Sequence, residues 1–184
     1  MGILSRVENF IIKKSDSTML IVIFGTIYFI SQIIIGSIIQ PLGVKNALAL
    51  QTTMCSDTFK AIASAWIASG QIEIYYRHFY FDNFHPIWYS IFLSLLIART
   101  FKINNVNPKF NFIILTPFIA GICDLIENIM HLYFLADLNR ATPALVTLSG
   151  LATNTKWTLA ALGVVTITVM LIVWLAKNFI MKKK

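Results

Sequence analysis

The segment from Ser17 to Val44 reads STMLIVIFGTIYFISQIIIGSIIQPLGV and contains no charged side chain. A helix needs about 20 apolar residues to cross the hydrocarbon core of a bilayer, so this run is long enough to span. The run ends in QPLG, residues 40–43, and lacks the small residues of a signal-peptide cleavage site. We therefore predict a retained membrane-anchoring helix over about residues 18–40.

The composition of the whole chain agrees with a membrane protein. Of the 184 residues, 57% are hydrophobic and 12% are charged, and the mean hydropathy is +0.73. The net charge of +7 would favour nucleic acid in a soluble protein, but basic residues gather at both ends of this chain, as is typical of chains oriented by a membrane. We predict an all-α integral membrane protein of one domain, residues 1–184, with membrane lipid and not nucleic acid as its surroundings.

Three further segments are long and apolar enough to span, at about 84–101, 110–136 and 157–177. A fifth segment, at about 52–76, contains three charged residues, and its uncharged stretch is short for a span. We expect it to form an outer amphipathic or partly inserted helix. The prediction is a bundle of four transmembrane helices with this additional helix.

Charge bias predicts how the chain is oriented. Four spans place both basic termini on one side, which the positive-inside tendency assigns to the cytoplasm. The richness in Ile, Phe, Asn and Lys fits a bacterial inner membrane. The last helical segment, about 143–178, would be about 54 Å long, so we expect a break at Gly150 or a part outside the membrane. The lysines at 182–184 are expected to fix topology and to contact anionic lipid.

A polar face interrupts the apolar segment at about 110–136. In CDLIENIMH, residues 123–131, the polar side chains of Asp124, Glu127, Asn128 and His131 fall at i, i+3, i+4 and i+7 and share one helix face. Ionisable groups at membrane depth are costly unless they face a protein interior or a wet cavity. This face is the first candidate for a functional site.

Helix rise predicts that other polar residues meet this face. Asp124 lies about 22 Å along its helix from Lys109, and Lys156 lies about 31 Å from Lys177, so both belong to the outer half of the membrane. Asp82 and His85 begin a helix at the same level, and Tyr89, one turn later, is expected to point inward. The predicted cluster contains Asp82, His85, Asp124, Glu127, Asn128 and Lys156.

Several chemical roles are open to this cluster. Its members could simply pair and pin helices together. Two carboxyls one turn apart resist double ionisation, so we expect Asp124 or Glu127 to act as an acid or a base. The spacing of His78, His85 and His131 matches no established metal motif, and we predict neither a metal nor a cofactor. The expected ligand-contacting residues are Asp82, His85, Tyr89, Asn128, His131, Lys156 and Trp157.

Three short stretches of the sequence resemble elements of known membrane proteins. With DNFHPIWY at 82–89, DLIEN at 124–128 and TKW at 155–157, the chain resembles a set of small bacterial multi-helix membrane proteins. That set carries D-x-x-[FH]-P-x-x-Y, D-x-x-E-N and T-x-K-W-like elements in this order. The likeness covers about residues 45–160 and implies the polar cluster but no reaction. In architecture alone, the chain is also similar to the EXPERA group of sterol isomerases and sterol-binding proteins, which transfers no function.

Three functions compete at this stage. The favoured one is binding of a lipid-like or sterol-like small molecule in an acid-lined cavity of the outer membrane half, with chemical conversion left open. The second is a small proton-coupled transporter, against which stands the absence of inverted repeats. The third is a non-catalytic partner or assembly protein whose buried acids are structural, within a homo-oligomer or with another membrane protein.

Overall fold

The computed structural model describes residues 2–181, and no strand occurs among them. The elements in chain order are α1 (Ile3–Lys14), α2 (Thr18–Ile39), η1 (Gln40–Leu42), α3 (Val44–Thr52), α4 (Ser56–Ala68), α5 (Ile72–Asp82), α6 (His85–Asn104), η2 (Pro108–Leu115), α7 (Thr116–Ala136), η3 (Leu138–Arg140) and α8 (Pro143–Met181).

Four helical stretches of the described chain are long and apolar enough to cross a membrane: Thr18–Leu42, His85–Asn104, Pro108–Ala136 and Pro143–Phe179. They coincide with the four predicted spans to within a few residues, except that α8 begins well before residue 157. The all-helical class and the four long apolar helices are therefore confirmed. Ser17 caps α2 by accepting a hydrogen bond from the Leu20 amide, and Pro86 and Pro117 occupy the first turns of α6 and α7.

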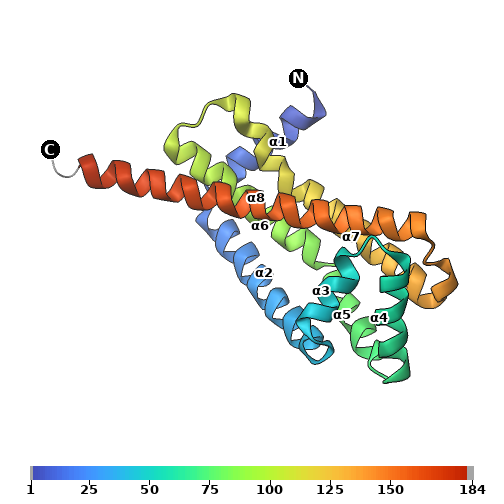
Figure 1. Cartoon of the computed structure of the whole chain (residues 1–184). Helices are drawn as coiled ribbons and strands as arrows, with labels where there is room; N and C mark the ends of the chain where they lie inside the picture. Colours follow the sequence, from blue (N-terminus) through green and yellow to red (C-terminus); the bar gives the residue numbers. More distant parts are fainter. Residues whose placement is uncertain (1, 182–184) are drawn as a thin grey trace.

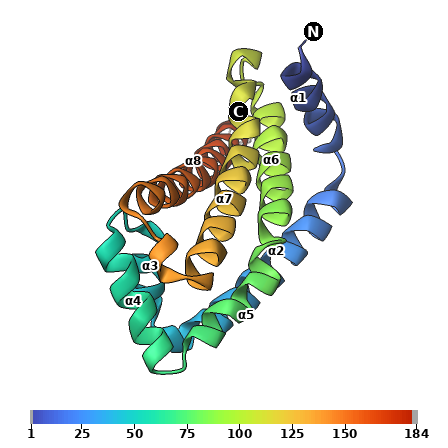
Figure 2. The same cartoon turned by 90° about the vertical axis from the view of Figure 1, so that its right-hand side faces the viewer.

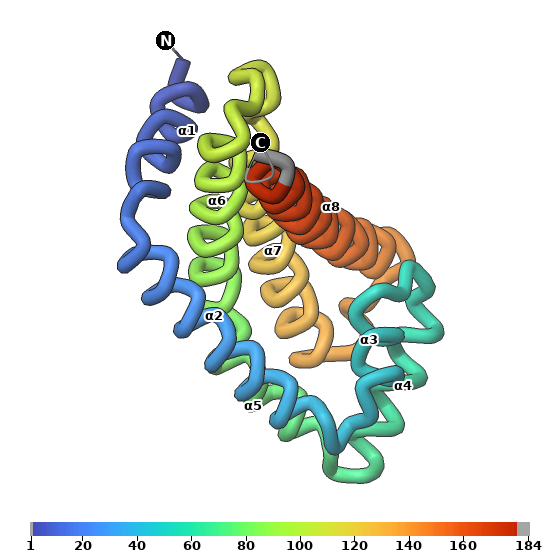
Figure 3. The backbone as a smooth tube through the Cα atoms, turned by 90° about the vertical axis from the view of Figure 1, so that its left-hand side faces the viewer, coloured from blue at the N-terminus to red at the C-terminus, as the bar shows by residue number. Residues whose placement is uncertain are grey.

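Helices α6 and α7 form the centre of the bundle (Figures 1 and 2). Helix α6 packs against α2, α7 and α8, and α7 packs extensively against α8. Helices α2 and α8 stand apart on opposite sides of this centre, and α3 lies between them at one end (Figure 3). Helix α1 and the last turns of α8 both lie at the other end of the bundle (Figures 2 and 3).

The segment 52–76 differs from its prediction as one helix. It contains the end of α3, the whole of α4 and the beginning of α5, separated by an extended stretch after Thr52 and a tight turn at Gly70. Gly70 has a φ of 70°, which glycine adopts without the cost of a Cβ, and this ends α4. Helices α3 to α5 form a cap whose core contains Phe59, Trp66 and Tyr75.

Of the two expectations for the last helical segment, the break at Gly150 is wrong, because α8 runs unbroken through it for 39 residues, about 58 Å. Gly150 instead allows a close contact between α8 and the cap. A Cβ built at this position would lie 2.4 Å from the Thr53 carbonyl oxygen and 2.9 Å from Cγ of Met54. The glycine is thus required by packing and not by helix termination. The lysines at 182–184 lie outside the described residues.

Helix α1 was not predicted from the sequence. This helix exposes Ile3, Leu4, Val7 and Phe10 on its surface and carries Lys13 and Lys14 in its last turn, which is typical of a helix at a membrane interface. It packs against α6 and η2. Just after α1, the Asp16 carboxylate binds Lys102 at 2.6 Å, and the nearby ammonium lowers the pKa of Asp16.

We predict that Gly150→Ala destabilises the protein by about 1–3 kcal/mol, because the new methyl group overlaps backbone atoms that cannot move freely. Gly163→Ala on the same helix is the matched control. Its Cβ would meet Ile97 at an ordinary 3.6 Å, and alanine gains up to about 1 kcal/mol of helix propensity. Thermal unfolding in detergent measures both. Equal melting temperatures for the two variants would contradict the packing role of Gly150.

Candidate functional site

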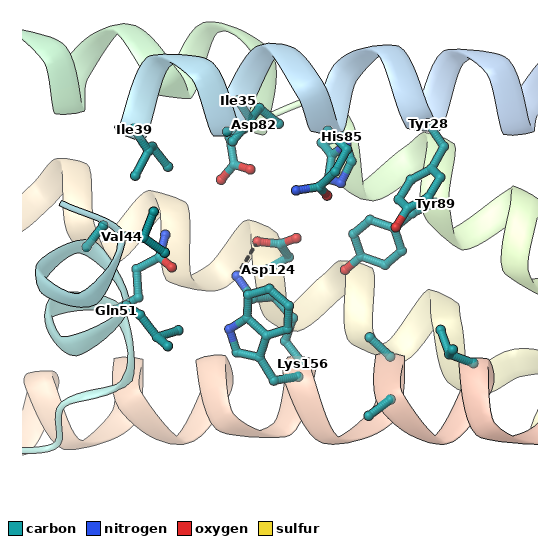
Figure 4. A pocket seen from close by; sticks show the side chains of 18 of the residues that line it. Tyr28, Ile35, Ile39, Val44, Gln51, Asp82, His85, Tyr89, Asp124 and Lys156 are labelled. Carbon is teal, nitrogen blue, oxygen red and sulfur yellow. Dashed lines mark hydrogen bonds and ion pairs between the residues drawn. The ribbon is translucent and has the colours of Figure 1, made fainter. Parts of the chain in front are cut away.

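A lysine bridges two carboxylates at the interface of α7 and α8. The Lys156 ammonium lies 2.8 Å from Oδ1 of Asp124 and 2.5 Å from Oε2 of Glu127. Asp124 and Glu127 are one turn apart and therefore share a face of α7. All three residues are buried, with exposed fractions of 7% or less. We call these three residues the ion cluster, and Figure 4 shows its Lys156–Asp124 pair.

A close approach of α6 to α7 positions the cluster relative to the other polar residues. Gly121 on α7 faces α6 so closely that a Cβ would lie 2.5 Å from Oγ of Ser90 and 3.2 Å from the Pro86 carbonyl oxygen. The Ser90 hydroxyl donates a hydrogen bond of 2.7 Å to the Pro117 carbonyl. These contacts bring the first turns of α6, with His85 and Tyr89, beside Asp124.

His85 joins α6 to α2. Its Nδ1 lies 2.7 Å from the Ser31 hydroxyl, and its ring stacks on Tyr28 with 5.4 Å between centroids. The Ser31 hydroxyl donates its own hydrogen to the Tyr28 carbonyl at 2.9 Å, so it accepts from His85. The proton of a neutral His85 ring is therefore on Nδ1, and Nε2 is left as an acceptor.

A cavity of about 590 Å³ is lined by residues of α2, α3, α5, α6, α7 and α8 (Figure 4). Its wall is mostly apolar. Helices α2 and α8 form opposite sides of it and make no extensive contact with each other. The polar and aromatic residues of the wall are Tyr28, Gln32, Gln51, Asp82, His85, Tyr89, Asp124, Lys156 and Trp157.

The residues proposed from sequence fall into two groups. Six of them line the cavity: Asp82, His85, Tyr89, Asp124, Lys156 and Trp157. Glu127, Asn128 and His131 do not line it and are at most 1% exposed. Glu127 holds Lys156 from behind, so it has no direct access to a bound molecule. His131 lies farther along α7 and bonds through Nδ1 to the Tyr75 hydroxyl at 2.9 Å, inside the cap.

Asp82 connects the cavity to the cap. Its Oδ2 lies 3.8 Å from Nε2 of His78, whose Nδ1 donates a hydrogen bond to the Tyr75 carbonyl. Burial raises the pKa of Asp82, against the opposing effect of the Lys156 charge. Burial also lowers the pKa of His78 to about 4, so its imidazole is neutral near pH 7. His78 therefore gives the Asp82 carboxyl no compensating charge.

The cavity wall also contains Tyr28, Gln32 and Gln51, which were not predicted from the sequence. Gln32 had a usable signal, because it is an amide in the middle of the uncharged run from Ser17 to Val44. Tyr28 had none, since an aromatic ring in a membrane helix faces lipid as readily as protein. Gln51 lies at the end of α3, and no helix was predicted between the segments at about 18–40 and about 52–76.

Within the part of the chain that the structure describes, no group of three or more His, Cys, Asp or Glu residues is placed to hold a metal ion. Comparisons with protein-family models, with curated proteins and with solved structures found no match to this chain. The chemistry available at the site is that of an ion cluster at the wall of an apolar cavity, with hydroxyl, amide and imidazole groups beside it.

We predict that Lys156→Met destabilises the protein by about 3–5 kcal/mol, because it leaves Asp124 and Glu127 buried without their cation. Adding Asp124→Asn and Glu127→Gln to this variant should restore part of the loss. Lys177→Met, on the exposed end of the same helix, is the control and should change little. Unfolding in mixed detergent micelles measures each value. A Lys156→Met protein as stable as the wild type would contradict the bridging role.

We predict that acid weakens the fold through His78. Its folded-state pKa of about 4 lies below the ordinary 6.5, so the unfolded chain binds the proton first as the pH falls. The free energy of unfolding should therefore fall between about pH 6.5 and 4, by up to about 3 kcal/mol from this residue. His78→Asn keeps a donor toward Tyr75 and should flatten this pH dependence. Identical profiles for wild type and variant would count against a neutral buried His78.

Proposed function

We propose that this chain is an integral membrane protein that binds a lipid-like or sterol-like amphiphile. The observation that carries the proposal is the cavity of about 590 Å³, whose apolar wall surrounds a few polar groups near Lys156. Small-molecule sites in proteins commonly have volumes of about 300–1,000 Å³ and this same mixture of lining groups. An elongated molecule with one polar end matches such a cavity.

The position of the cavity between α2 and α8 supports access from the bilayer. Both helices expose apolar side chains on their outer faces, among them Phe29 and Ile33 on α2 and Val165 on α8. In a membrane these faces contact lipid acyl chains, so the space between the two helices opens sideways toward lipid. An amphiphile that enters there places its tail against apolar side chains and its polar group near the ion cluster.

We place the cavity in the outer half of a bacterial inner membrane, with both termini in the cytoplasm. The basic residues at the terminal end of the bundle support this orientation through the positive-inside tendency. The cavity lies toward the opposite end, near the cap. The residues concerned are Arg6, Lys13, Lys14, Arg99, Lys102, Lys109 and Lys177.

Within this proposal the carboxyls have different roles. Asp82 and Asp124 line the cavity and would contact the polar end of the ligand. Glu127 is completely buried and holds the Lys156 ammonium, so it is a positioning residue. If the bound molecule is also converted, Asp124 is the carboxyl placed to exchange a proton with it, and not Glu127.

The test is mass spectrometry of small molecules retained by protein purified in mild detergent. Ala160 lines the cavity, and Ala160→Phe should fill it and abolish retention of the ligand. Leu162→Phe adds an aromatic ring to an exposed position of the same helix that does not line the cavity, and it should retain the ligand. The same bulk lipids in the same proportions in wild type and both variants would refute binding in this cavity.

A further inference from the structure

Acidic groups outnumber basic groups around the cavity. Asp82, Asp124 and Glu127 supply three carboxyls, and Lys156 is the only lysine or arginine among the described residues that forms an ion pair with any of them. The Lys156 ammonium is already bonded to Asp124 and Glu127. Asp82 is therefore the carboxyl of the cavity wall that contacts no lysine or arginine within the described part of the chain.

Neither His78 nor His85 supplies Asp82 with a full positive charge. His78 faces Asp82 at 3.8 Å but is neutral near pH 7, as described above. His85 donates from Nδ1 to Ser31, which a neutral imidazole does equally well, and an ordinary histidine is mostly neutral above pH 7. The carboxyl of Asp82, which lines the cavity, is thus left without a full positive charge beside it.

The Tyr89 hydroxyl and several aromatic rings also line this cavity. The Tyr89 hydroxyl is buried, with the residue 6% exposed, and has no hydrogen-bond partner among the described residues. Figure 4 shows the ring of Tyr89 extending into the cavity toward Asp124, with the ring of Tyr28 beyond it. Trp157 adds an indole to the lining, half exposed. Aromatic faces attract cations, and most strongly where water is excluded.

We propose that the amphiphile bound in this cavity has a cationic head group, an amine or a quaternary ammonium, which lies between Asp82 and the aromatic rings of Tyr89 and Trp157. This inference rests on the proposed ligand-binding function. The cation pairs with the Asp82 carboxyl, which no described lysine or arginine contacts, and an amine also offers a donor to the Tyr89 oxygen. An anionic head group would have to displace a carboxylate from Lys156 while facing the Asp82 carboxyl.

Four dodecyl probes of different charge test the inference on the full chain in maltoside micelles: dodecyltrimethylammonium, dodecylphosphocholine, dodecanol and dodecyl phosphate. Saturable binding is measured by equilibrium dialysis as the difference between wild type and the cavity-filled Ala160→Phe variant. We expect dodecyltrimethylammonium to bind at least about tenfold more tightly than dodecanol and dodecyl phosphate. Equally tight binding of dodecylphosphocholine would identify a choline-type lipid head group as the source of the cation, and its exclusion would identify a free cationic amphiphile.

Asp82→Asn should reduce the ratio of cation affinity to dodecanol affinity by about tenfold. Glu73→Gln makes the same charge change at an exposed position of α5 and should leave that ratio unchanged. Saturable binding that favours dodecanol or dodecyl phosphate would overturn the cationic head group while leaving the cavity function intact. Absence of saturable binding for every probe would count against the cavity function itself.

Discussion

An ammonium group held between two carboxylates in an apolar bundle determines how this structure is arranged. Removing charged groups from water is costly, and the mutual attraction of the three groups offsets that cost only while Lys156 stays in contact with Asp124 and Glu127. The contact fixes the register of α8 against α7. Helix α6 is in turn held to α7 at Gly121. The contact between α8 and α7 therefore brings Lys156 to the cavity that Asp82, His85 and Tyr89 also line.

The sequence was sufficient for the long helices because apolar length is a local property. The run after Ser17 and the apolar segments around α6, α7 and α8 each exceed the length that a bilayer requires. The internal arrangement of residues 52–76 was not predictable in the same way. Its breaks depend on Gly70 in a left-handed conformation and on an extended stretch before Ser56, and neither alters the hydropathy. Helix α1 was missed because its apolar residues are dispersed among charged ones.

The polar cluster was predictable in part. Helical spacing places Asp124, Glu127, Asn128 and His131 on one face, and helix rise brings Lys156 to their level. Spacing does not reveal which members of a face line a cavity and which are enclosed behind it. That distinction depends on the neighbours of α7. Lys156 covers Glu127, and Tyr75 of the cap binds His131, whereas Asp124 remains at the cavity wall. The contribution of α2 to the wall depends on tertiary packing alone.

The unbroken length of α8 has a mechanical consequence. Gly150 and Lys156 lie six residues apart on one rigid helix, about 9 Å along its axis. The contact between Gly150 and the Thr53 carbonyl fixes this rod against the cap, and the ion cluster fixes it against α7. The rod cannot slide along its axis without disturbing both contacts. The depth of the charged group is therefore set by the packing of the cap as well as by its own pairing, and a movement of the cap would be transmitted directly to Lys156.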